Sequence, residues 1–116
     1  SYFKKALKIN PNYPEAYNNL AWLQATCPDP TFRNGKDALG NAKKALALFS
    51  EDPFFTLDTL AAAYAESGNF TEAIKWQQKA IAKTPPRLAA DLESRLQFYR
   101  LKQPYRQGMQ PENKSE

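Results

Sequence analysis

Apolar residues in the middle of the chain recur at the spacing of an amphipathic helix. Leu57, Leu60, Ala61 and Tyr64 stand at positions i, i+3, i+4 and i+7. At 3.6 residues per turn, these positions share one side of the helix. The spacing therefore predicts a helix that buries this stripe against the rest of the domain.

A turn and a second helix follow this stripe. Gly68 suits the left-handed position that closes a helix, and Asn69 with Glu72 three residues later has the sequence of a capping box. The second helix ends before Pro85, because proline lacks the amide hydrogen that continues a helix. Residues 54–87 therefore read as one complete helix-turn-helix unit.

Residues 14–53 repeat this unit with an insertion. The first helix is predicted to end near Thr26 and the second to span residues 35–49. The loop between them, residues 27–34, contains two prolines, and we expect Phe32 to fold back onto the helices and order it. The N-caps predicted for the later helices are Asn34, Asp52 and Asn69.

The N-terminal end reads as part of another unit. Residues 1–13 are predicted to be the second helix of a truncated repeat, and the chain opens without Met inside this helix, so we expect a piece of a longer protein. Phe3 and Leu7 lie four residues apart on one apolar face. Because the helix that would cover this face does not precede them, we expect weak homo-oligomerisation through it.

At the other end, one apolar stripe predicts a final helix that is polar on its opposite side. The stripe consists of Leu88, Leu92, Leu96 and Tyr99. This helix lacks the small residues at which another unit would pack, so residues 86–103 are predicted to be a capping helix. Residues 104–116, which are mostly polar, are predicted to be a disordered tail.

The 34-residue unit resembles the tetratricopeptide repeat (TPR), whose pattern is W-x2-L-G-x2-Y, then A-x3-F, then P. Leu57 takes the Trp position, Ala61 the Gly position and Gln77 the Phe position. The resemblance to the repeat covers residues 1–87. The longer stretch from Leu20 through Tyr99-Arg100 and Pro104-Tyr105-Arg106 looks like the C-terminal end of bacterial TPR proteins. The resemblance implies an all-α fold, a short right-handed TPR solenoid of antiparallel helix pairs, in which residues 1–103 form one TPR domain.

The resemblance also implies protein–protein interaction through a concave face formed by the first helix of each repeat, which would bind a peptide or partner protein. Asn19 matches a position where peptide-binding TPR proteins place an Asn that hydrogen-bonds the ligand backbone, although a solvated Asn19 is the alternative. Trp22 and Phe55 are candidate apolar contacts, or they pack between repeats. The predicted site residues are Glu15, Asn18, Asn19, Trp22, Phe55, Asp58, Thr59 and Ala62.

Composition argues against an enzyme and a metal site. The 116 residues contain no His and one Cys, Cys27, so histidine-based catalysis and His-containing metal sites are excluded within this chain. No glycine-rich phosphate loop or metal-ligand cluster is present, and we expect no catalytic residues, no cofactor and no metal. The lone Cys slightly favours a reducing compartment such as the cytoplasm. No signal peptide or membrane span is recognisable, but we expect any targeting signal to lie outside this piece, so the sequence does not fix a compartment.

A net charge of +4 permits a polyanionic partner. Lys5, Lys44 and Lys79 occupy equivalent positions on successive second helices and would form an outer stripe. That side lacks aromatic residues to stack bases, so we expect a solvated face and no nucleic acid. Two other functions stay open: a regulatory or substrate-presenting C-terminal segment of a larger enzyme, such as a glycosyltransferase or kinase, and a structural self-assembly unit.

Overall fold

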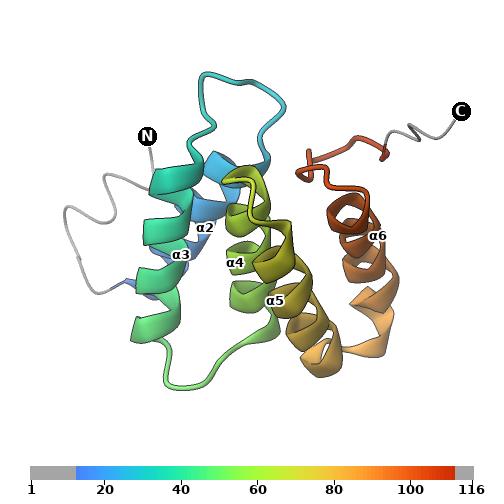
Figure 1. The fold of residues 1–116 in the computed structure, drawn as a ribbon. Coiled ribbons are helices and arrows are strands. Elements are labelled where there is room, and N and C mark those ends of the chain that lie inside the picture. Colours follow the sequence, from blue (N-terminus) through green and yellow to red (C-terminus); the bar gives the residue numbers. More distant parts are fainter. Residues whose placement is uncertain (1–12, 112–116) are drawn as a thin grey trace, which may run out of the picture.

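The computed structural model describes residues 13–111, all of whose regular elements are helical. The predictions for residues 1–12, including self-association through Phe3 and Leu7, lie outside the described residues. Figure 1 shows the helices as a row of rods joined by loops. The elements are α2 (Pro14–Thr26), α3 (Gly35–Leu48), α4 (Phe54–Glu66), α5 (Phe70–Lys83), the 3-10 helix η1 (Pro86–Leu88) and α6 (Ala89–Arg100).

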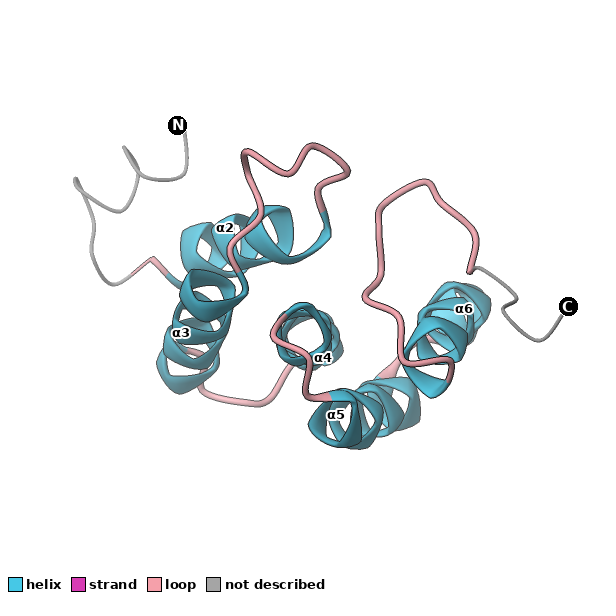
Figure 2. Ribbon diagram, turned by 45° about the horizontal axis from the view of Figure 1, so that its top comes forward, coloured by secondary structure: helices cyan, strands magenta, loops and turns pink. Residues whose placement is uncertain are grey.

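The helices pack in successive pairs. α2 packs on α3, α4 packs on α5, and the two pairs join because α4 contacts both α2 and α3. α6 extends the row by packing on α5 (Figure 2). This arrangement confirms the predicted all-α fold, a short solenoid of helix pairs.

Small residues let the helices of the first pair approach each other closely. Ala21 and Ala25 on α2 and Ala38 and Ala42 on α3 are all buried in one cluster. Because these alanines are buried, a larger side chain at any of them would have to displace its neighbours. The alanine spacing in the sequence therefore fixes the distance between the paired helices.

α4 is the central helix and is buried on almost every side. All residues from Thr56 to Ala63 are buried, as is Ala65. Its stripe residue Leu57 packs towards Leu92 of α6, whereas Ala62 packs with α2 and α3. The sequence placed Ala62 on an open groove, but neighbouring helices cover it to 1 % exposure.

Three of the predicted helix ends are correct and one is wrong. The Asn34 side chain accepts a hydrogen bond from the Asp37 amide (3.0 Å), and Asn69 accepts one from Glu72 (3.2 Å). Gly68 has φ +86°, which allows the chain to leave α4 in the left-handed conformation. Asp52 does not cap α4, because the N-cap is Pro53 and no side chain fills that role.

The loop at residues 27–34 is held by polar contacts and not by its aromatic residue. Arg33 Nη1 donates to the carbonyl oxygens of Cys27 (2.8 Å) and Pro28 (2.9 Å). Asp29 accepts from the amide and hydroxyl of Thr31. Phe32 is 52 % exposed, so the prediction that its ring orders the loop is wrong.

α6 ends in a turn that a non-glycine residue closes. Leu92, Leu96 and Tyr99 are buried as the apolar stripe predicts. The Gln103 amide donates to the Phe98 carbonyl (2.9 Å) and the Lys102 amide to the Tyr99 carbonyl (3.0 Å), while Lys102 has φ +57°. This bonding pattern is a Schellman motif, in which glycine usually occupies the left-handed position.

Candidate functional site

The first helices of the pairs, α2 and α4, together with α6, form one side of the molecule, which we call the inner face. The loop at residues 27–34 and the segment that follows α6 both extend on this side (Figure 2). The latter segment, residues 103–110, we call the C-terminal strap. It has no regular secondary structure, and it runs back from the end of α6 towards the end of α2.

Tyr105 of the strap contacts both flanking helices of the inner face. Its ring centroid lies 5.8 Å from that of Trp22 on α2 and 5.2 Å from that of Phe98 on α6. The Phe98 contact is edge-to-face at 85°, a geometry that aromatic quadrupoles favour. Tyr105 therefore bridges α2 and α6 across the central helix.

The next two residues of the strap bind the C-terminal ends of α2 and α4. Arg106 Nη1 lies 2.7 Å from Glu66 Oε1 at the end of α4 and donates to the Ala25 carbonyl (3.4 Å). The Gln107 amide donates to the Thr26 carbonyl (3.0 Å). Carbonyls in the last turn of a helix lack helical partners and carry partial negative charge, so they favour a cation and an amide donor here.

A buried charge pair lies beneath the strap. Arg95 of α6 donates from Nε to Asp58 Oδ1 (3.0 Å) and from Nη2 to Oδ2 (3.1 Å). Gln77 Nε2 of α5 donates to the same Asp58 Oδ1 (3.0 Å) and to the Leu92 carbonyl (3.0 Å). Gln77 stands where the repeat pattern expects Phe. Its amide makes hydrogen bonds to buried polar groups, where a Phe ring would make apolar contacts.

Arg95 also completes an aromatic cluster with Trp22 and Tyr105. Its guanidinium carbon lies 5.2 Å from the Trp22 ring centroid and 5.3 Å from that of Tyr105. Burial alone lowers the pKa of Arg95, but the charge and hydrogen bonds of Asp58 outweigh it and the pKa lies above its ordinary value. The cluster therefore holds a permanent cation against two ring faces, an attractive arrangement.

Tyr99 lies next to this pair with its hydroxyl buried. Burial, and secondly the negative charge of Asp58, raise the pKa of Tyr99 well above its ordinary value. Its hydroxyl makes no hydrogen bond within the part of the chain that the structure describes. The group is therefore neutral, and it adds no charge to the inner face.

The predicted site residues divide into accessible and covered groups. Glu15 and Asn19 are exposed on α2, Trp22 is partly buried, and Phe55 on α4 is 39 % exposed. The buried ones are Asn18, Asp58, Thr59 and Ala62.

The buried side chains of α4 have structural contacts. Asp58 is held by Arg95 and Gln77, and the Thr59 hydroxyl donates to the Phe55 carbonyl (2.9 Å). Their polar groups are thus already occupied, whereas Asn18 Oδ1 is buried and has no hydrogen-bond partner among residues 13–111.

Several residues of the inner face had no signal in the repeat pattern. Arg95 and Phe98 were assigned to a cap, and Tyr105 and Arg106 to a disordered tail. The structure instead packs Tyr105 and Arg106 against three helices, while residues 112–116 lie outside the described range. An aromatic residue next to a basic one in an otherwise polar tail was the available clue.

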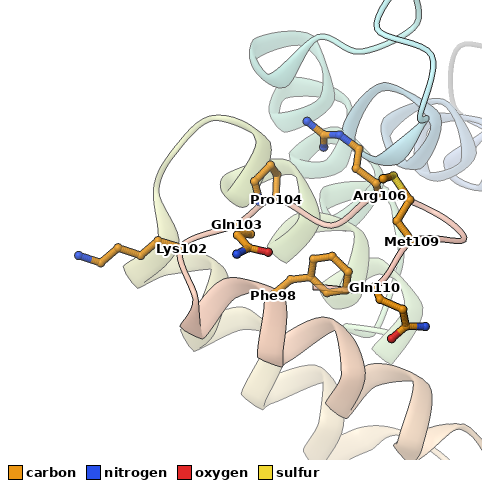
Figure 3. Close-up of a pocket in the computed structure, with 7 residues that line it drawn as sticks. All are labelled: Phe98, Lys102, Gln103, Pro104, Arg106, Met109 and Gln110. Atoms are coloured by element: carbon orange, nitrogen blue, oxygen red, sulfur yellow. The ribbon is translucent and has the colours of Figure 1, made fainter. Parts of the chain in front are cut away.

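The strap and the end of α6 line a hollow of about 240 Å³ that is open to solvent. Figure 3 shows the Phe98 ring rising from α6 into this hollow, with Met109 and Gln110 on the far side and Lys102 pointing away. Arg106 points away from Phe98, towards the helix ends that it binds (Figure 3).

Within residues 13–111, no cluster of three or more His, Cys, Asp or Glu side chains is placed to hold a metal ion. None of the described helices has the length and apolar character needed to cross a lipid bilayer.

Part of the chain matches a known protein family. A model of the tetratricopeptide repeat family matches residues 2–47, a stretch that contains α2 and nearly all of α3. No curated protein and no solved structure matched the chain. The family-model match and the paired-helix fold confirm the resemblance, and they support the tetratricopeptide repeat family for this chain.

Proposed function

We propose that this chain binds a peptide or a segment of a partner protein on its inner face. The tetratricopeptide repeat family indicates a protein–protein interaction module, and such repeats are typically non-catalytic. The assignment to the inner face and to a peptide ligand is our proposal.

One observation carries it: the inner face already holds a non-helical stretch of polypeptide. Residues 105–107 are bound by aromatic contacts, by a charge contact to Glu66 and by a backbone hydrogen bond to the Thr26 carbonyl. These are the interactions by which a peptide is recognised, with apolar anchors for affinity and fixed polar groups for orientation. The same surface is therefore suited to a segment of another protein.

The accessible predicted residues extend this surface beyond the strap. Glu15 and Asn19 lie on the earlier turns of α2, and Phe55 lies in the first turn of α4. The amide of Asn19 both donates and accepts hydrogen bonds, so it can pair with a peptide backbone. A ligand that contacts these residues would run along the inner face from the helix N-termini towards Trp22.

A phage-displayed library of random peptides tests the proposal with two baits, the full chain and its variant Tyr105→Ser, Arg106→Ala, in which the strap's own contacts to the inner face are removed. We expect enriched peptides whose affinity falls at least tenfold in the double variant Asn19→Ala, Phe55→Ala. Gln78→Ala, an exposed substitution on α5, is the matched control and should leave binding unchanged. Failure to enrich any peptide, or loss of binding only in the α5 variant, would overturn the proposal.

A further inference from the structure

We infer that the C-terminal strap is an exchangeable occupant of the inner face, and that this face recognises an aromatic residue followed directly by a basic residue. The inference rests on the proposed function and adds the ligand's chemistry and its regulation. Tyr105 and Arg106 are the intramolecular copy of that ligand. A partner segment of the same chemistry must displace them.

Beyond the turn that closes α6 at Gln103, the ring contacts and the ion pair of the strap are made by two adjacent residues. Tyr105 and Arg106 are partly buried, and they contact α2, α4 and α6. The side chains of residues 107–110 are exposed. After Arg106, the strap makes two backbone hydrogen bonds among the described residues. The Gln107 amide bonds to the Thr26 carbonyl, and the Met109 amide bonds to the Arg106 carbonyl within the strap itself.

The receiving surface is built without the strap. Arg95 is oriented by its two hydrogen bonds to Asp58, and Trp22 packs against the alanine cluster of α2 and α3. Phe98 belongs to a buried cluster with residues of α4 and α5. Because these side chains are positioned by the helices, release of the strap leaves a preformed site, which lowers the cost of binding a replacement.

Charge selects the second position of the ligand. Glu66 faces Arg106 at 2.7 Å, and the nearby carbonyls of Ala25 and Thr26 end α2 with partial negative charge. Glu66 Oε2 also lies 3.7 Å from Nε of Arg33 in the 27–34 loop, so the Glu66 carboxylate is shared by two arginines. A basic side chain with several donors satisfies both the carboxylate and the carbonyls, whereas an acidic one would be repelled.

The first position selects an aromatic ring for a separate reason. The Tyr105 ring centroid lies within 6 Å of the Trp22 ring, the Phe98 ring and the Arg95 guanidinium carbon. An aliphatic side chain would keep the apolar contact but lose the edge-to-face and cation–π attractions.

Tethering explains why the strap keeps a free ligand out. A segment joined to its site by a few residues has an effective concentration on the order of millimolar. A peptide with the same contacts but no tether must exceed that concentration to compete. Weakening the strap, while leaving the receiving surface intact, should therefore reveal peptide binding.

The test uses the full chain and a fluorescein-labelled peptide with the sequence of residues 101–111. We expect the variant Tyr105→Ser, Arg106→Ala to bind this peptide at least tenfold more tightly than the unchanged chain, as measured by fluorescence anisotropy. A peptide carrying the same two substitutions should bind at least tenfold more weakly than the unsubstituted peptide. Met109→Ala, which alters the strap outside its two held residues, should behave as the unchanged chain.

Circular dichroism establishes that the variant keeps its helices, and the single variant Tyr105→Ser replaces it if the double variant unfolds. The inference is overturned if the variant and the unchanged chain bind the peptide equally, or if neither binds it. It is also overturned if the two peptides bind equally well. The library experiment judges the proposed function separately, because its peptides need not resemble the strap.

Discussion

Removal of Asp58 should be among the most damaging single changes in this domain. Asp58 is 6 % exposed and accepts three hydrogen bonds, two from Arg95 and one from Gln77. Asp58→Ala leaves the Arg95 guanidinium buried without its counter-charge and Gln77 with the Leu92 carbonyl alone. Breaking one side of a buried pair costs roughly 3–5 kcal/mol, and the partial exposure of Arg95 places our expectation near the lower end, at about 3 kcal/mol.

Urea unfolding followed by circular dichroism measures this loss. With a slope of about 1–3 kcal/mol per molar urea, a change of about 3 kcal/mol lowers the midpoint by roughly 1–3 M. Asp91→Ala, which removes an exposed carboxylate from α6, is the control and should change the free energy of unfolding by less than about 0.5 kcal/mol.

A double-mutant cycle separates the pair from the side chains around it. Arg95→Met keeps much of the packing but leaves Asp58 uncompensated, so it should also destabilise the domain. The double variant removes both charges and should be more stable than the sum of the two losses implies, by about 2 kcal/mol. If the two losses instead add to within about 0.5 kcal/mol, the charge pair contributes no coupling and the reasoning is refuted.

Three further changes test other features of the fold. Lys102→Gly should raise the free energy of unfolding by about 0.5–1 kcal/mol, because glycine adopts φ +57° without strain, and a lowered melting temperature would contradict this. Tyr99→Phe should be neutral or stabilising by about 1 kcal/mol, since it removes a buried hydroxyl that has no partner among the described residues. The pKa of Tyr99 is raised in the folded protein, so the neutral hydroxyl's contribution to the free energy of unfolding is complete below the unfolded-state pKa of about 10 and is lost as the pH rises above it. Urea midpoints should therefore drop less at high pH in the variant than in the unchanged chain. Ala62→Leu should cost about 1–3 kcal/mol, as should Ala61→Leu, because both alanines are fully covered, and a midpoint unchanged by Ala62→Leu would show that this side of α4 is open.

The sequence by itself determined the helices and their pairing. Periodicity places Leu57 and Leu60 on one side of a helix, and Asn34 and Gly68 mark helix ends through contacts within a few residues of themselves. Such signals are local, so they can be recognised from a short stretch of sequence without knowledge of the rest of the chain. The repeat spacing then implied that neighbouring pairs stack.

Only the tertiary structure decided which surface stays open. Ala62 and Thr59 were expected on a groove, but whether a side of α4 is exposed depends on how α2, α3 and α6 close around it. The periodicity of one helix carries no information about that closure. Phe32 is the opposite case, an apolar residue left exposed because polar contacts hold its loop.

The position of the strap is the clearest example of a feature that local sequence cannot predict. The hydrogen bond from Arg106 to the Ala25 carbonyl joins residues 81 positions apart, and Arg95 meets Asp58 across 37. The composition of residues 104–116 favours disorder, because a polar segment buries too little surface of its own to offset the entropy of ordering. Tyr105 and Arg106 are ordered because the surface that binds them is assembled from three helices elsewhere in the chain, and no short stretch of sequence contains it.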